Sequence, residues 1–218
     1  MTTVDAIIFD LDNCLADARE VGEALVAPMF EAIRAANQGR LTEAQLERAF
    51  ADTWRMALDA VAEKHDFSPA MLDAGWNVAR TLAVAGPMRG YADLPVLREL
   101  GVPLFLVTSG FRRLQESKID ALGLRDLLTA FVDAIDEPDR VGKRGLFARI
   151  LADHGFAPAR VLVVGDSPES EIAAGNAMGM PTVQLLRPGV VRGTTAAYCL
   201  RDLHELRRLL QASSRGAE

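Results

Sequence analysis

The chain has 218 residues, of which 50% are hydrophobic and 25% are charged, and its formal net charge is −6. These values are typical of a globular protein, and the negative charge argues against a general nucleic-acid-binding surface. No apolar run approaches the length of a membrane span, the first residues lack a signal-peptide pattern, and the two cysteines form no CxxC motif. We therefore expect a cytoplasmic protein with no membrane or nucleic-acid partner.

Five short apolar runs predict buried β-strands. They lie at residues 4–9, 102–107, 130–135, 160–165 and 181–186. Helical patterns precede or separate the later runs and stop at glycines suited to terminate a helix, namely Gly101, Gly123 and Gly155. Strands that alternate with helices predict a parallel α/β sheet with helices on both faces.

The clearest helical pattern covers residues 41–64. Thr42 is suited to be its N-cap, and Gln45 would complete a capping box. A second helix is expected to begin after Ser68, because a proline at the first helical position follows it. The first of these helices would carry one apolar stripe, formed by Leu46, Phe50, Trp54, Ala57 and Val61.

Both helices fall in a long segment without a convincing strand, residues 17–88. A structureless loop of this length is improbable inside a compact domain. We therefore predict a helical subdomain of residues 17–88, inserted after the first strand of an α/β core that comprises residues 1–16 and 89–218.

Polar side chains stand at the predicted ends of three strands. These residues are Asp10 and Asp12, then Thr108 and Ser109, then Asp166 and Glu171. Ligands of open α/β sheets bind at the carboxyl ends of the strands, and Lys143, just before a helix, could reach the same edge. Taken singly, each motif can be explained as a turn, a helix cap or a surface lysine. Their order along the chain favours one shared acidic site.

In this order the motifs resemble the haloacid dehalogenase superfamily of hydrolases. The resemblance covers nearly the whole chain and is carried by "FDLDNCL", "LFLVTSG", Lys143 and "VVGDSPESEIAAGNAMGM", the last being the most specific. It implies a Rossmann-like, doubly wound parallel sheet with the strand order 3-2-1-4-5. It also implies that the inserted segment is a helical C1-type cap of the phosphatase-like branch.

The resemblance further implies a Mg²⁺ site. Its ligands would be Asp10, the backbone carbonyl of Asp12, and Asp166, while Glu171 would contact the metal through water. Oxygen ligands suit Mg²⁺ better than zinc, and no cluster of histidines and cysteines competes for this role.

The implied reaction is the hydrolysis of a small phosphorylated metabolite. Asp10 would attack phosphorus and form an aspartyl-phosphate, and Asp12 would act as general acid and then general base. Thr108, Ser109 and Lys143 would bind the phosphoryl oxygens and stabilise their charge.

Three residues depart from the family pattern. Cys14 stands where the family usually has Thr or Val, and Glu171 stands one residue beyond the position where a second Asp is frequent. Arg144 follows Lys143 where the family often has Pro, so Lys118 is a rival for the phosphate-binding lysine. We prefer Lys143, because Lys118 lies within a predicted helix.

Four alternative functions use a similar acidic site. A phosphomutase of the same superfamily shares every residue named so far and stays open as the main alternative. A dehalogenase is disfavoured by Asp12, since a halide leaving group needs no proton, and a phosphonatase would need a reactive lysine in the cap, where Lys64 is the only lysine. A receiver-like phospho-acceptor without turnover is disfavoured by the long insertion and by Asp10 on the first strand.

Overall fold

The structure, a computed structural model, describes residues 3–215 of the chain. Six strands form one parallel sheet in the order β3-β2-β1-β4-β5-β6. Their bounds are β1 Ala6–Phe9, β2 Leu104–Gly110, β3 Thr129–Ala134, β4 Val161–Gly165, β5 Thr182–Leu185 and β6 Tyr198–Leu200. The predicted fold class and strand order are confirmed, and β6 extends the sheet beyond the prediction. Residues 1–2 and 216–218 of the predicted core lie outside the described residues.

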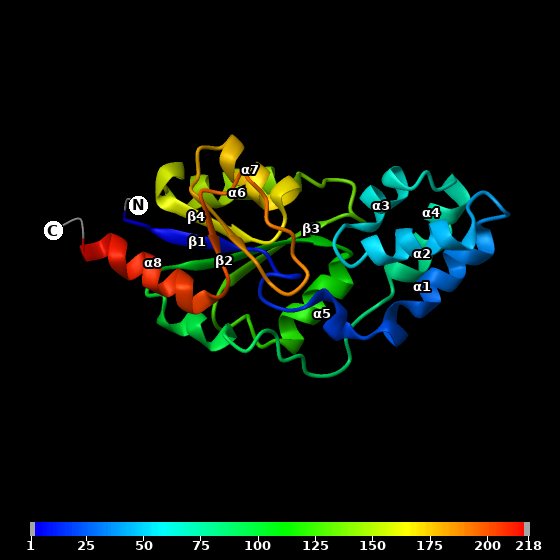
Figure 1. Ribbon diagram of the computed structural model, residues 1–218, viewed down its shortest axis with the longest axis horizontal. Coiled ribbons are helices and arrows are strands. Elements are labelled where there is room, and N and C mark those ends of the chain that lie inside the picture. Colours follow the sequence, from blue (N-terminus) through cyan, green and yellow to red (C-terminus); the bar gives the residue numbers. More distant parts are fainter. Residues whose placement is uncertain (1–2, 216–218) are drawn as a thin grey trace.

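Two helical layers cover the two faces of the sheet (Figure 1). One layer contains α5, α8 and a 3₁₀-helix, and the other contains α6 and α7. Their bounds are α5 Arg112–Ala121, α8 Leu203–Arg215, the 3₁₀-helix Leu94–Glu99, α6 Gly142–His154 and α7 Ala173–Ala177. In β1, Ile7 and Phe9 pack with the α5–α8 layer, whereas Ile8 packs with α6. Because both faces of this strand are buried, its sequence is an uninterrupted apolar run.

Four helices between β1 and β2 form a body of their own beside the sheet (Figure 1). We call these helices the cap: α1 Glu23–Ala36, α2 Glu43–Asp52, α3 Leu58–Lys64 and α4 Pro69–Ala79. The cap has its own hydrophobic cluster around Ile33 and Met71, which Phe111 and Ile135 of the core also join. The helices expected in the inserted segment are therefore present, while the exact domain boundaries stay a prediction.

The single helix predicted at residues 41–64 is wrong, because the structure breaks it between α2 and α3. In the break, Thr53 donates its hydroxyl to the Phe50 carbonyl, and the Trp54 carbonyl accepts the Asn13 side chain at 2.9 Å. These hydrogen bonds compete with the helical pattern, and Thr and Trp have modest helix propensity. The break consequently brings a segment of the cap against the first loop of the core.

The predicted helix ends are largely confirmed. Thr42 and Gln45 form the capping box, and the Ser68 hydroxyl accepts the Met71 N–H at the start of α4. The three predicted terminating glycines all have positive φ: Gly101, Gly123 and Gly155. The segment before the first of them forms a 3₁₀-helix instead of an α-helix.

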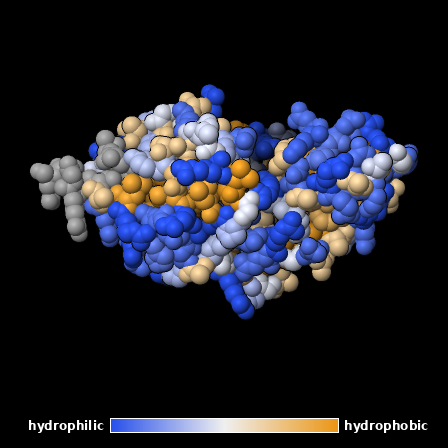
Figure 2. Space-filling model, in the orientation of Figure 1, coloured by the Kyte–Doolittle hydropathy of each residue, from blue (hydrophilic) through white to orange (hydrophobic). Residues whose placement is uncertain are grey.

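Figure 2 shows that a hydrophobic band crosses this face of the core between α8 and the α6–α7 layer. The visible surface of the cap is mostly hydrophilic, which agrees with the inward packing of its apolar residues. Within residues 3–215, we find no helix with the length and hydrophobicity needed to cross a bilayer.

Candidate active site

The loop after β1 positions the first two acidic residues. The Asp10 N–H donates to the Val164 carbonyl of β4 at 2.9 Å, so this residue is still anchored to the sheet. Three residues later the chain turns sharply at Asn13, which has a φ of 57°. Asparagine tolerates this left-handed conformation better than most residues. β1 ends at Phe9, and the Leu11 carbonyl accepts the Leu15 N–H at 2.9 Å, so Asp12 already lies in the loop.

A buried lysine connects two of the acids. Lys143 Nζ lies 2.7 Å from Asp10 Oδ1 and 2.8 Å from Glu171 Oε2. The other Glu171 oxygen accepts the Ser167 N–H at 2.7 Å, so both oxygens of this carboxylate are engaged. A Cβ on Gly165 would overlap the Glu171 side chain, which explains a glycine directly before Asp166.

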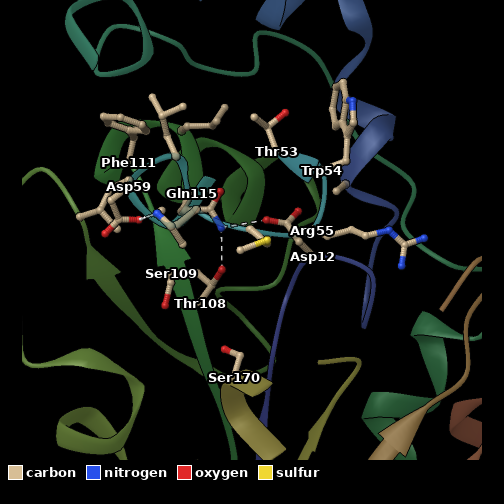
Figure 3. A pocket seen from close by; sticks show the side chains of 18 of the residues that line it. Asp12, Thr53, Trp54, Arg55, Asp59, Thr108, Ser109, Phe111, Gln115 and Ser170 are labelled. Carbon is tan, nitrogen blue, oxygen red and sulfur yellow. Dashed lines mark hydrogen bonds between the residues drawn. The ribbon is translucent and has the colours of Figure 1, made fainter. Parts of the chain in front are cut away.

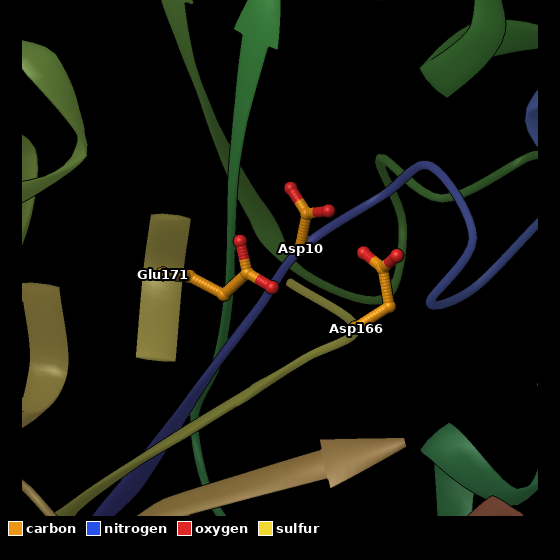
Figure 4. A group of neighbouring side chains, drawn as sticks. All are labelled: Asp10, Asp166 and Glu171. Carbon is orange, nitrogen blue, oxygen red and sulfur yellow. The ribbon is translucent and has the colours of Figure 1, made fainter. Parts of the chain in front are cut away.

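Asp10, Asp166 and Glu171 gather at the ends of β1 and β4 (Figure 4). Burial, only partly offset by Lys143, raises the pKa of Asp10 to about 7. Burial and the nearby Asp10 and Glu171 raise the pKa of Asp166 to about 8. Burial also opposes ionisation of Glu171, but Lys143 and the hydrogen bonds to its carboxylate outweigh it and lower the pKa. One lysine thus does not neutralise three carboxylates.

The same three residues have the donor chemistry of a divalent-cation site. Each offers a carboxylate oxygen, and these oxygens lie within 4.8 Å of one another. No hydrogen-bond donor among residues 3–215 reaches the Asp166 carboxylate, which leaves its oxygens available beside Asp10. An all-oxygen set of this kind fits Mg²⁺, a hard cation that would also relieve the raised pKa values.

Asp12 belongs to a second polar group, on the α5 side of the site. Lys118 Nζ lies 2.9 Å from Asp12 Oδ1 and 2.8 Å from Oδ2. Gln115 Nε2 donates to Asp12 Oδ2 at 3.0 Å and to Thr108 Oγ1 at 2.5 Å (Figure 3). The two candidates for the phosphate-binding lysine, Lys143 and Lys118, therefore both lie in the site. Each forms an ion pair with a different aspartate.

Ser109 is already held by another side chain. Its hydroxyl donates to Asp133 Oδ2 at 2.8 Å, and Arg140 contacts the same carboxylate at 3.0 Å. Arg140 also reaches from the core to Asp59 of the cap, with a nitrogen–oxygen distance of 2.6 Å. This chain of contacts connects the end of β2 to α3.

A cavity of about 470 Å³ lies between the cap and the strand ends. All of the predicted site residues line it: Asp10, Asp12, Thr108, Ser109, Lys143, Asp166 and Glu171. Apolar side chains from both the inserted segment and the core also line the cavity, including Val26, Met29, Leu82, Phe111 and Ile135. The structure thus brings the predicted residues together, and their individual roles stay predictions.

Sequence reasoning missed three residues of this site. Gln115 was not considered, although it lies three residues before Lys118 and hence on the same face of the helix. Arg140 and Asp59 were also missed, and the sequence gives no signal that pairs them. Cys14, in contrast, points away from the cavity toward the Val164 carbonyl, and burial raises its pKa well above the ordinary value. It is not a reactive thiol.

Comparisons with known proteins show which proteins the chain is similar to. A family model described as haloacid dehalogenase-like hydrolase matches residues 4–179. The chain is 34% identical over 135 residues to enolase-phosphatase E1 of Sorangium cellulosum, a match that covers 58% of the chain and 57% of that relative. It is 28% identical over 177 residues to the pyrimidine 5′-nucleotidase YjjG of Escherichia coli, with 79% and 74% covered. The chain spans little more than half the length of the first relative and about three quarters of the second.

Solved structures are similar to the chain as well. The HAD-hydrolase YfnB from Bacillus subtilis, solved with bound magnesium, superposes with a TM-score of 0.64 and is 16% identical, over 96% of this chain and 99% of that one. At this level of identity the likeness shows the fold alone. The family model covers most of the chain, including every strand that carries a site residue, and the chain therefore belongs to the haloacid dehalogenase-like hydrolases.

Proposed function

We propose that the protein is a Mg²⁺-dependent phosphatase that hydrolyses a small phosphate monoester through an aspartyl-phosphate on Asp10. The observation that carries this proposal is the position of Asp10 at the end of β1. It is buried, bound through Oδ1 to Lys143, and next to Asp166, whose carboxylate has no donor among the described residues. A nucleophile, a cation and a free metal ligand are thus grouped at one strand end.

The proposed reaction has two steps. In the first, an Asp10 oxygen bonds to phosphorus, the bond from phosphorus to the ester oxygen breaks, and Asp12 gives that oxygen a proton. In the second, Asp12 takes a proton from water, whose oxygen attacks phosphorus and releases phosphate and free Asp10. Lys143 and Thr108 would bind the phosphoryl oxygens. Bound Mg²⁺, held by Asp10, the Asp12 carbonyl and Asp166, would supply positive charge to the anionic phosphoryl group.

The relatives support a phosphatase more than any other hydrolase. Both curated relatives carry phosphatase-type names, an enolase-phosphatase and a 5′-nucleotidase. The magnesium bound to YfnB supports the choice of metal for the acidic cluster of this chain.

The cavity favours hydrolysis over the phosphomutase alternative. A mutase that works through a bisphosphate must hold a second phosphate away from the nucleophile, which requires free cationic groups. Within the described residues, the cationic side chains that line the cavity are Arg55, Lys118, Arg140 and Lys143. Three of them are paired with carboxylates, and the fourth donates to a backbone carbonyl. Because three of these four cations are already paired with carboxylates, the cavity favours a leaving group without a second negative charge.

A phosphate-release screen tests the proposal. Purified protein with Mg²⁺ should release phosphate from small monoesters, and EDTA should stop the release. Asp10→Asn should abolish it, while the exposed Asp73→Asn serves as the matched control. Turnover at the wild-type rate by Asp10→Asn would overturn the proposed nucleophile. A strict requirement for a sugar bisphosphate would instead support the mutase.

A further inference from the structure

The two lysines of the site contact different acids. Lys143 binds Asp10 and Glu171, whereas Lys118 binds Asp12 alone. The Lys118 side chain is 7% exposed, and its ammonium group lies within 2.9 Å of both Asp12 oxygens. Lys118 is thus paired with the carboxylate of Asp12, whereas Lys143 is paired with that of Asp10.

Gln115 completes the arrangement from the same helix. It is 2% exposed and lies one turn before Lys118 on α5. Its amide donates to Asp12 Oδ2 and to the Thr108 hydroxyl, so Gln115 and Lys118 both hold the Asp12 carboxylate and Gln115 also connects it to β2. Among the described residues, Asp12 Oδ2 receives two donors and Oδ1 receives one. Oδ1 therefore has room for one more hydrogen bond.

We infer that Lys118, with Gln115, is a positioning residue that holds Asp12 Oδ1 toward the leaving-group oxygen. The inference rests on the proposed phosphatase function and assigns the two lysines separate tasks. Lys143 serves the nucleophile and the phosphoryl group, and Lys118 serves proton transfer by Asp12. In the first step, a side chain that acts only on proton transfer matters for substrates whose leaving group needs a proton and matters little for the others, whereas the second step is the same for every substrate.

Two substrates separate these tasks. Propyl phosphate releases an alkoxide that requires protonation, whereas 4-nitrophenyl phosphate releases a stable phenolate. Lys118→Met should lower kcat/KM, which reports the first step alone, by about 100-fold for propyl phosphate and by less than about 10-fold for 4-nitrophenyl phosphate. Lys143→Met should lower activity on both substrates to a similar degree. Lys64→Met, at an exposed lysine of α3, should change neither.

A double-mutant cycle adds a readout that a structural or phosphate-binding role would not produce. If Lys118 acts only by positioning Asp12, then adding Lys118→Met to Asp12→Asn should change kcat/KM little further. Equal losses of kcat/KM on the two substrates, or losses that multiply in the double variant, would overturn the inference and leave the phosphatase proposal standing.

Gln115→Leu provides a second variant of similar volume if Lys118→Met does not fold. It removes one of the two donors to Asp12 Oδ2 and should show the same preference for loss on propyl phosphate, at a smaller magnitude. A Gln115→Leu loss that is equal on both substrates would overturn the inference. A wild-type protein that hydrolyses neither substrate with Mg²⁺ would overturn the proposed function and this inference together.

Discussion

Replacing Asp10 by Asn should stabilise the metal-free protein at high pH, even though it should abolish turnover. The pKa of Asp10 is raised from 3.8 to about 7, chiefly by burial. The folded protein therefore keeps this proton up to about pH 7, whereas the unfolded chain releases it near pH 4. The free energy of unfolding should consequently fall as the pH rises between about 4 and 7, and level off above that range.

The size of the effect follows from the shift. About 3 pH units at about 1.4 kcal/mol each give a penalty of about 4 kcal/mol above pH 7, most of which develops above pH 5. Asparagine cannot ionise and avoids this penalty. The stability advantage of Asp10→Asn over wild type should thus be about 2.5 kcal/mol larger at pH 8 than at pH 5.

Urea unfolding in EDTA at the two pH values measures this difference. Asp73→Asn, at an exposed position of α4, is the control and should stay close to wild type throughout. Adding Mg²⁺ at pH 8 should stabilise wild type more than Asp10→Asn, because the variant offers a neutral amide oxygen in place of a carboxylate. An advantage of Asp10→Asn that is equal at pH 5 and pH 8 would refute the reasoning about the buried carboxylate.

Three further predictions concern single contacts. Arg140→Ala and Asp59→Ala should each raise KM several-fold with a smaller change in kcat, because either removes the ion pair between cap and core; equal kinetics of both variants and wild type would contradict this. Cys14→Thr should change the free energy of unfolding by less than about 1 kcal/mol and leave kcat unchanged, since a hydroxyl can replace the thiol on the β4 carbonyl. Gly165→Ala should remove most activity and lower the thermal midpoint, because its Cβ would collide with Glu171; a fully active variant would show that Glu171 can move freely.

The sequence was sufficient for the parts of the site that depend on strand ends. The apolar run of β1 and the acids after it predicted both the sheet and the place of Asp10. The alternation of side chains along the strand also predicts the face of the sheet on which Asp10 lies. Ile8 packs with α6, and Asp10, two residues later, binds Lys143 of the same helix. The sixth strand was missed because "YCL" is short and lies after a long loop, with little apolar pattern of its own.

Contacts that depend on the placement of the cap could not be derived in this way. The pairing of Arg140 with Asp59 joins a core loop to α3 across a long sequence separation, and both residues look like ordinary surface charges in the sequence. The break between α2 and α3 has the same origin, because Asn13 of the core binds the Trp54 carbonyl. Helical periodicity continues through the break and gives no warning of it.

The two helical layers explain how two aspartates that are two residues apart can have different partners. In an extended strand, Asp10 and Asp12 would point to the same face of the sheet. Here β1 ends at Phe9 and Asp12 lies in the following loop, so each acid meets a lysine from a different layer, Lys118 of α5 or Lys143 of α6. In a doubly wound sheet, the helices on each face can carry one cation. A DxD motif that extends beyond the strand can pair one aspartate with each of them. Nucleophile and proton donor can then share one strand end without sharing one counter-charge.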